Sequence, residues 1–209
     1  MTVVSFLCIR VTKATEEDQA KLEHLLGYFN NTLKKRLNIA GDLLMLVVAY
    51  IDAAFALHFD SKSHTGVMIL VGGTVVYVSS RKQKCIAKSP TEAELVGFTD
   101  NLGLVELFHE FVSFLLGRKV PVPLVFQDCT AVISLVTIGG GITRTKHMRA
   151  RKNLGKEAVD AKRLFVRYIN TKEMMADRLS KTLEGEAFQK FASCVLGEMK
   201  LTVKTTGGC

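Results

Sequence analysis

The chain has 209 residues, enough for one domain with appendages or at most two small domains. Hydrophobic residues make up 48% of it and charged residues 23%, a balance typical of a globular protein with a core, and the formal net charge is +8. The 5 cysteines are scattered and form no Cys-x-x-Cys pair, so we expect reduced thiols in an intracellular protein, and neither a disulfide framework nor a zinc site. The longest apolar run, at 43–51, is too short to span a membrane, and no charged segment precedes the apolar start, which argues against a secretion signal.

Positive charge is concentrated in two stretches. Between Arg144 and Arg167 there are nine Lys or Arg residues against two acidic ones, and the segment 81–88 has four basic residues and no acidic one. Clustered basic charge suits a polyanion, because each neutralised phosphate releases counterions. On charge alone, the simpler interpretation is a solvated positive face. The candidate nucleic-acid contacts are Arg81, Lys82, Lys84, Lys88, Arg144, Lys146, Arg149, Arg151 and Lys152.

The first predicted element is an amphipathic helix. Residues 15–35 mix charged and apolar groups, and Leu22, Leu25, Leu26 and Phe29 recur at helical spacing. After a turn, the apolar run at 43–51 predicts a strand that is buried on both faces.

A hairpin and a long helix follow. Apolar stretches at 67–71 and 75–78 are joined by two glycines, which is typical of a β-hairpin. The long helix reaches about Leu116, and its start is well marked. Ser89 is the expected N-cap, with Pro90 at the first helical position and a glutamate at the third that would complete a capping box.

The remaining elements alternate between strand and helix. They are a strand at 123–127, a helix at about 130–136, a break at the glycines 139–141, a helix near 147–160, a strand at 164–170, and helices at about 172–182 and 184–196. This order predicts an α/β fold with a mixed five-stranded sheet flanked by helices. The first three strands would be antiparallel, and the strand after the long helix would lie parallel beside the first one.

Four acidic residues fall at positions that this topology brings together. Asp52 follows the most apolar strand, and Asp128 directly follows the strand expected beside it. Glu94 lies just over one turn into the long helix, and Asp177 is flanked by apolar residues near the end of the sheet-forming region. We therefore expect the four carboxylates to gather at one edge of the sheet.

Each carboxylate also has a simpler explanation. Asp52 could be a turn residue, Asp128 a helix cap and Glu94 a solvated helix residue, while Asp177 alone would attract no attention. Two carboxylates about 4 Å apart repel by roughly 4 kcal/mol at an effective dielectric near 20. Four together therefore need hard divalent cations, Mg²⁺ above all, and the sequence has no cysteine or histidine cluster that would favour zinc.

The sequence resembles the ribonuclease H domain of copia-type retrotransposon Pol polyproteins. The matching segments are YIDAAFALHFDSKSHTG at 50–66, KSPTEAELVGFTD at 88–100, VFQDCTAVI at 125–133, TRTKHM at 143–148 and EMMADRLSKTL at 173–183. They occur in the family's order and with similar spacing. The resemblance implies a ribonuclease H-like fold over about two thirds of the chain.

The resemblance also implies a mechanism, the hydrolysis of the RNA strand of an RNA–DNA hybrid. In that family the catalytic carboxylates correspond to Asp52, Glu94, Asp128 and Asp177, and the same four would bind two Mg²⁺ ions, for which Mn²⁺ can substitute. Ions held about 4 Å apart would activate a water and stabilise the leaving oxygen. A histidine in these enzymes assists product release, which makes His147 a further candidate. The simpler interpretation is a histidine at the start of a helix that makes a local hydrogen bond.

The resemblance extends to the front of the chain, which is similar to the segment joining the polymerase portion to the ribonuclease H domain. We therefore divide the chain into a connection-like helical segment at 1–41, a ribonuclease H-like domain at 42–183, and a C-terminal helix with a loose tail at 184–209. The expected partners are an RNA–DNA hybrid and the polymerase portion of the same reverse transcriptase, with no membrane and no small-molecule cofactor. The expected location is intracellular, in cytoplasmic retrotransposon particles or alternatively in the nucleus. The competing hypothesis is a catalytically inactive nucleic-acid-binding remnant.

Overall fold

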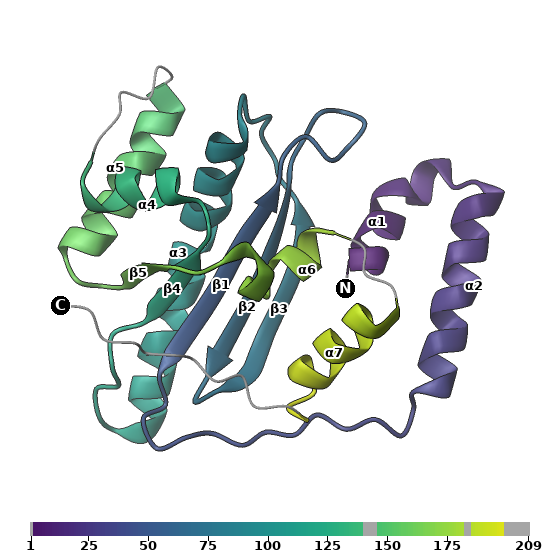
Figure 1. Cartoon of the computed structure of the whole chain (residues 1–209), viewed down its shortest axis with the longest axis horizontal. Helices are drawn as coiled ribbons and strands as arrows, with labels where there is room; N and C mark the ends of the chain where they lie inside the picture. Colours follow the sequence, from purple (N-terminus) through teal and green to yellow (C-terminus); the bar gives the residue numbers. More distant parts are fainter. Residues whose placement is uncertain (1, 140–145, 182–184, 199–209) are drawn as a thin grey trace.

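The computed structural model describes residues 2–139, 146–181 and 185–198 (Figure 1). The predicted loose tail and Arg144 lie outside these residues. The elements in chain order are α1 (Thr2–Arg10), η1 (Val11–Lys13), α2 (Glu16–Asn31), β1 (Val47–Ala54), β2 (His64–Val71), β3 (Thr74–Lys82), α3 (Pro90–Leu116), β4 (Leu124–Gln127), α4 (Thr130–Thr137), α5 (Lys146–Asp160), β5 (Phe165–Tyr168), η2 (Thr171–Glu173), α6 (Asp177–Ser180) and α7 (Gly185–Val195).

The strands form one mixed sheet in the order β3-β2-β1-β4-β5. Strands β1, β2 and β3 are antiparallel neighbours, whereas β4 is parallel to β1 and β5 is parallel to β4. The expected fold class, with three antiparallel strands followed by parallel additions, is thereby confirmed. Because β1 and β4 run in the same direction, the residues that follow their C-terminal ends emerge at the same edge of the sheet.

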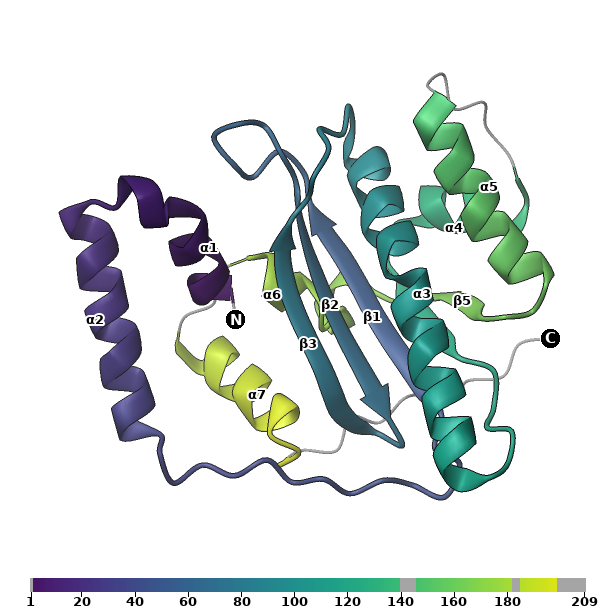
Figure 2. The ribbon, with the colours of Figure 1, turned by 180° about the vertical axis from the view of Figure 1, so that it is seen from behind.

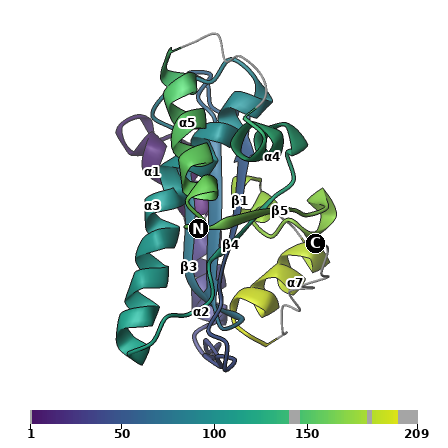
Figure 3. The same cartoon turned by 90° about the vertical axis from the view of Figure 1, so that its left-hand side faces the viewer.

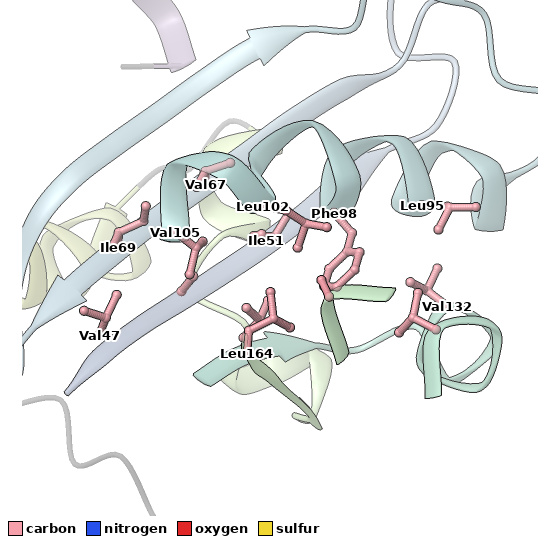
Figure 4. Packing of buried hydrophobic residues seen from close by; sticks show 14 of the residues in the cluster. Val47, Ile51, Val67, Ile69, Leu95, Phe98, Leu102, Val105, Val132 and Leu164 are labelled. Atoms are coloured by element: carbon pink, nitrogen blue, oxygen red, sulfur yellow. The ribbon is translucent and has the colours of Figure 1, made fainter. Parts of the chain in front are cut away.

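Each face of the sheet carries its own apolar core, because successive strand residues point to opposite faces. From β1, Val47 and Ile51 pack with Phe98 of α3 on one face (Figure 4). On the other face, Tyr50 packs with residues of α6 and α7, among them Leu179. Figure 3 shows α3 on one side of the sheet and α7 on the other. The prediction that β1 is buried on both faces is confirmed.

The start of α3 follows the predicted signals with one difference. The Ser89 side chain accepts a hydrogen bond from the Glu92 backbone N–H (3.2 Å), and Pro90 is the first helical residue. The Glu92 carboxylate, however, accepts from the backbone N–H of Lys88 (2.8 Å) and not from that of Ser89. The predicted capping box is therefore wrong in its return bond, although Glu92 is still held at the helix start.

Three segments differ from the predictions. The first strand begins at Val47 and not at 43, because Leu43 and Leu44 are exposed and lie in a turn before the strand. A hydrogen bond from the Met45 backbone N–H to the Asp42 carboxylate (2.9 Å) closes this turn. The first amphipathic helix, α2, ends at Asn31 and is preceded by the unpredicted α1. The helix expected at 172–182 is replaced by η2 and the single turn of α6.

Helices from the two halves of the sequence lie near one another beside the sheet (Figure 1). Helix α1 contacts β3, and α2 lies at the outer edge of the molecule, beyond α1 and α7 (Figures 1 and 2). The rings of Tyr28 in α2 and Phe188 in α7 pack edge to face, with centroids 5.5 Å apart. Within the described part of the chain, no helix has the length and apolar character needed to cross a membrane.

Candidate metal centre

Three of the four predicted carboxylates meet at one edge of the sheet. Oxygen atoms of Asp52, Glu94 and Asp128 all lie within 4.8 Å of one another. The parallel register pairs Tyr50 with Phe126, so that Asp52 and Asp128 come two residues later on neighbouring strands. The start of α3, which carries Glu94, lies at the same edge (Figure 1).

Glu94 is held by groups from both strands. One of its carboxylate oxygens accepts a hydrogen bond from the Ala53 backbone N–H (3.1 Å), and the other accepts from the Gln127 side-chain amide (3.3 Å). The Gln127 side-chain oxygen in turn accepts from the Asp128 backbone N–H (3.1 Å). Glu94 is thus only 7% exposed, and its carboxylate is fixed between β1 and β4.

The segment 171–181, which we call the strap, completes the site from the other face of the sheet. The Ser180 hydroxyl donates to the Asp52 carboxylate (2.6 Å), and the Thr171 hydroxyl donates to the Asp128 carboxylate (2.8 Å). Asp177 begins α6 and lies close enough to raise the pKa of Asp52 by its negative charge. It is not one of the three carboxylates with oxygens inside 4.8 Å, so it borders the cluster.

Burial dominates the electrostatics of the cluster. It raises the pKa of Asp52 to about 6, and the charges of Asp177 and Asp128 add to this effect, while the hydrogen bond from Ser180 opposes it. Burial also raises the pKa of Glu94 to about 9, again helped by a negative neighbour, Asp52. Without a cation the site therefore holds protons, because charged carboxylates are poorly solvated there and repel one another.

The residues present fit a hard divalent cation. Carboxylate oxygens are the ligands that Mg²⁺ and Mn²⁺ prefer, and no sulfur or imidazole belongs to this cluster of described residues. One positive group already lies beside it, since the Lys181 ammonium pairs with the Asp177 carboxylate. The carboxylates can therefore bind a divalent cation, which can in turn bind a phosphate oxygen.

The simpler explanations for three of the acidic residues are wrong. Asp52 lies inside β1 and is buried, so it is not a turn residue. Asp128 does not cap α4, whose N-cap is Cys129 and has no side-chain hydrogen bond. Glu94 is buried and not solvated.

His147 lies apart from this network. It is exposed in the first turn of α5, and no hydrogen bond or ion pair links it to the four carboxylates within the ranges that the structure describes. Its role in product release stays a prediction.

The predicted nucleic-acid contacts divide into two groups. Four side chains are exposed and form no side-chain hydrogen bond or ion pair within the described ranges: Lys84, Lys88, Lys146 and Arg149.

The other four described residues have partners inside the molecule. Lys82 pairs with Asp60 (2.8 Å), and Arg151 pairs with Asp100 of α3. Arg81 donates to a tyrosine hydroxyl (2.8 Å), and Lys152 donates to a backbone carbonyl (2.6 Å). These four contribute to the fold whether or not they bind nucleic acid.

The residues that support the carboxylates were not predicted from the sequence patterns: Gln127, Thr171, Ser180 and Lys181. Gln127 carried a usable signal, because a polar residue at the end of a fully buried strand needs a polar partner. The other three belong to the strap, whose path over the sheet depends on tertiary packing.

The strand order and the carboxylates where β1 and β4 end define a ribonuclease H-like fold. No protein-family model matches the chain.

Among curated proteins, the chain is similar to retrotransposon Pol polyproteins. The retrovirus-related Pol polyprotein from transposon TNT 1-94 of Nicotiana tabacum is 30% identical over 175 residues, a match that covers 83% of the chain and 13% of the polyprotein. The corresponding polyprotein from transposon RE1 of Arabidopsis thaliana is 27% identical over 180 residues, covering 86% of the chain and 12% of the polyprotein. The chain thus spans only 12–13% of the length of these relatives. The predicted resemblance to copia-type Pol polyproteins is confirmed.

Among solved structures, the chain is similar to LC11-RNase H1, which was isolated from compost by a metagenomic approach. The two are 17% identical, with a TM-score of 0.47, and the match covers 65% of this chain and 92% of that one.

Proposed function

We propose that the chain is a metal-dependent endonuclease that hydrolyses the RNA strand of RNA–DNA hybrids during retrotransposon reverse transcription. The observation that carries this proposal is the meeting of Asp52, Glu94 and Asp128, with oxygens inside 4.8 Å, in a chain related to Pol polyproteins. The ribonuclease H-like fold supports the same function.

Asp52, Glu94, Asp128 and Asp177 would bind the divalent cations, with Mg²⁺ as the natural ion and Mn²⁺ as a substitute. Bound cations would supply an activated water and stabilise the charge that develops on the leaving oxygen. The chain's own residues hold the carboxylates for this task, since Ser180 fixes Asp52 from the strap (2.6 Å). Exclusion of water from the buried oxygens of Glu94 strengthens its attraction for a cation.

Substrate binding would rely on positive surface charge around the edge of the sheet that carries the carboxylates. Phosphates of either strand would contact the exposed basic residues, and also Arg81, Lys82, Arg151 and Lys152 when these leave their partners within the molecule. Contacts to 2′-hydroxyls would distinguish RNA from DNA. We also propose that residues 1–41 connect this domain to a polymerase portion, and that the protein acts in cytoplasmic retrotransposon particles.

Cleavage of a defined substrate tests the proposal. The purified chain and an Asp128→Asn variant are incubated with a labelled RNA–DNA hybrid and Mg²⁺. Asp128 is only partly buried, and the asparagine amide can still accept the hydrogen bond from Thr171, so the variant should fold. Cleavage of the RNA strand by the parent alone supports the proposal, while cleavage of duplex DNA in preference to the hybrid would contradict it.

A catalytically inactive nucleic-acid-binding remnant is the second candidate. The observation that favours it is the ion pair between Lys181 and Asp177, because the ammonium already neutralises a carboxylate that a second cation would need. In the same assay this candidate predicts equal hybrid binding by parent and variant, with no cleavage by either.

A further inference from the structure

A cavity of about 570 Å³ lies between the N-terminal helix and the loop that joins β1 to β2. Its walls include Phe6 from α1 and Leu57, His58 and Phe59 from the loop. This cavity is separate from the carboxylate cluster, and no residue of the cluster lines it.

Contacts beneath the cavity fix its aromatic wall. The Phe6 ring stacks on the His64 ring, with centroids 5.1 Å apart and an interplanar angle of 20°. The His64 imidazole is hydrogen-bonded to His58 (3.0 Å) on one side and to Ser80 (2.8 Å) on the other. Because His64 is completely buried, these contacts connect α1, the loop and β3 beneath the cavity.

One wall residue has no structural reason for its position. Phe59 is fully exposed at the tip of the loop, although burial of a phenylalanine side chain away from water is favourable. Every nucleobase has a flat face that can stack on such a ring, at about 1–3 kcal/mol per base. An exposed ring on the wall of this cavity can therefore stack on a base.

The charged groups of the cavity suit a phosphate. Arg10, Lys13 and Lys82 line it against a single acidic residue, Asp60, which gives three positive charges to one negative. Arg10 is paired with Asp18 (2.8 Å) and Lys82 with Asp60 (2.8 Å). Lys13 forms no ion pair with any other residue in the described part of the chain, so its ammonium is available to a polyanion.

The cavity lies within reach of the carboxylate cluster. The loop leaves β1 at Ala54, two residues after Asp52, at the edge of the sheet that carries the cluster (Figure 1). Phe59 comes seven positions after Asp52, so the two are at most about 25 Å apart along an extended chain. A strand bound at the cluster needs to extend by only a few nucleotides to enter the cavity.

We propose that this cavity binds a nucleotide of a single-stranded extension of the substrate, with its base stacked on Phe59 and its phosphate beside Lys13. The inference rests on the proposed function, because it takes the hybrid as the molecule that brings the extension to the cavity. Phe59 and Lys13 bind here and take no part in the hydrolysis.

Binding measured without cleavage tests the inference. Fluorescence anisotropy in EDTA compares a labelled blunt hybrid with the same hybrid carrying a short single-stranded extension, of DNA in one arm and of RNA in another. The variants are Phe59→Ala and, as a matched control, Phe114→Ala, whose ring is also largely exposed but lies near the other end of α3 from Glu94. Both rings are exposed, so neither change should affect folding.

Phe59→Ala should weaken binding of the extended hybrid about tenfold, the loss expected for one stacked base, and leave the blunt hybrid unaffected. Phe114→Ala should bind both as the parent does. The arm with the larger loss identifies the strand that enters the cavity. Equal affinities of Phe59→Ala and the parent for the extended hybrid overturn the inference, as does an equal loss for blunt and extended hybrids. Absence of cleavage by the parent in Mg²⁺ would instead contradict the proposed function, and the binding comparison would still be readable.

Discussion

The acidic cluster and the basic segments differ in how the fold treats their charge. The carboxylates of Asp52 and Glu94 are buried and tied by hydrogen bonds to a neighbouring strand or to the strap. The basic side chains are either exposed or paired with groups of the same molecule, as Lys82 and Arg151 are. Burying unpaired charge is costly, so the buried carboxylates destabilise the folded state and a bound cation would stabilise it. The basic side chains carry no such cost, because they are exposed or paired. Changes in the two regions should therefore differ in size and in kind.

The largest effect is expected for Asp52→Asn. This change keeps the shape of the side chain and removes a negative charge from the centre of the cluster, where several kcal/mol of cation-mediated stabilisation is concentrated. Hybrid cleavage should fall at least about a thousandfold, because each 1.4 kcal/mol corresponds to a factor of ten. Initial rates in Mg²⁺ provide the measurement. A variant that keeps more than a tenth of the parent's rate would show that Asp52 is not part of the proposed metal centre.

A smaller loss is expected when the strap no longer orients Asp52. In Ser180→Ala the donor at 2.6 Å disappears while the carboxylates remain. Loss of such an orienting bond typically costs about 10–100-fold in metal affinity or activity. Activity should recover in part at high Mg²⁺, and a titration of rate against Mg²⁺ would show this. Ser134→Ala, on the exposed face of α4, is the control and should behave as the parent.

The raised pKa values predict how the metal-free protein responds to pH. Glu94 has an ordinary value of 4.5 and a folded value of about 9, so the folded state binds its proton more tightly than the unfolded state does. The stabilisation is complete below pH 4.5 and is lost as pH rises towards 9; Asp52 adds a loss between its ordinary value of 3.8 and about 6.

In EDTA the Tm should therefore fall by at least about 3 °C between pH 5 and pH 9. Glu94→Gln should flatten this dependence, because an amide does not titrate. Thermal unfolding across the pH range provides the measurement. A Tm that is independent of pH in the parent would show that Glu94 is not buried as described.

The smallest effect is expected in the basic segments. Arg149 is exposed, so Arg149→Ala should weaken hybrid binding only about two- to threefold and lower the slope of log affinity against log salt by about 1. Binding isotherms at several salt concentrations would measure both. Unchanged affinity and slope would show that this end of α5 does not contact phosphates.

Local signals in the sequence predicted most of the helices and strands, but not the residues that hydrogen-bond to the carboxylates. Ser89 and Pro90 located the start of α3 because capping is decided within one turn. The carboxylates of Asp52 and Asp128 could be placed together because parallel strands end at the same edge. In contrast, α1 is an apolar segment without a polar face, and it is helical where it packs on β3 and α6, with Thr2 donating to the Leu179 carbonyl (3.1 Å). Such contacts join segments that are far apart in the sequence, and no local pattern encodes them.

Titration calorimetry with Mn²⁺ tests the central claim most directly, since the claim is that these carboxylates form a cation site. The parent should show saturable binding at pH 7.5 that releases protons, and Asp52→Asn should lose it. Saturable binding that is undiminished in the variant, or no saturable binding by the parent, would contradict the account.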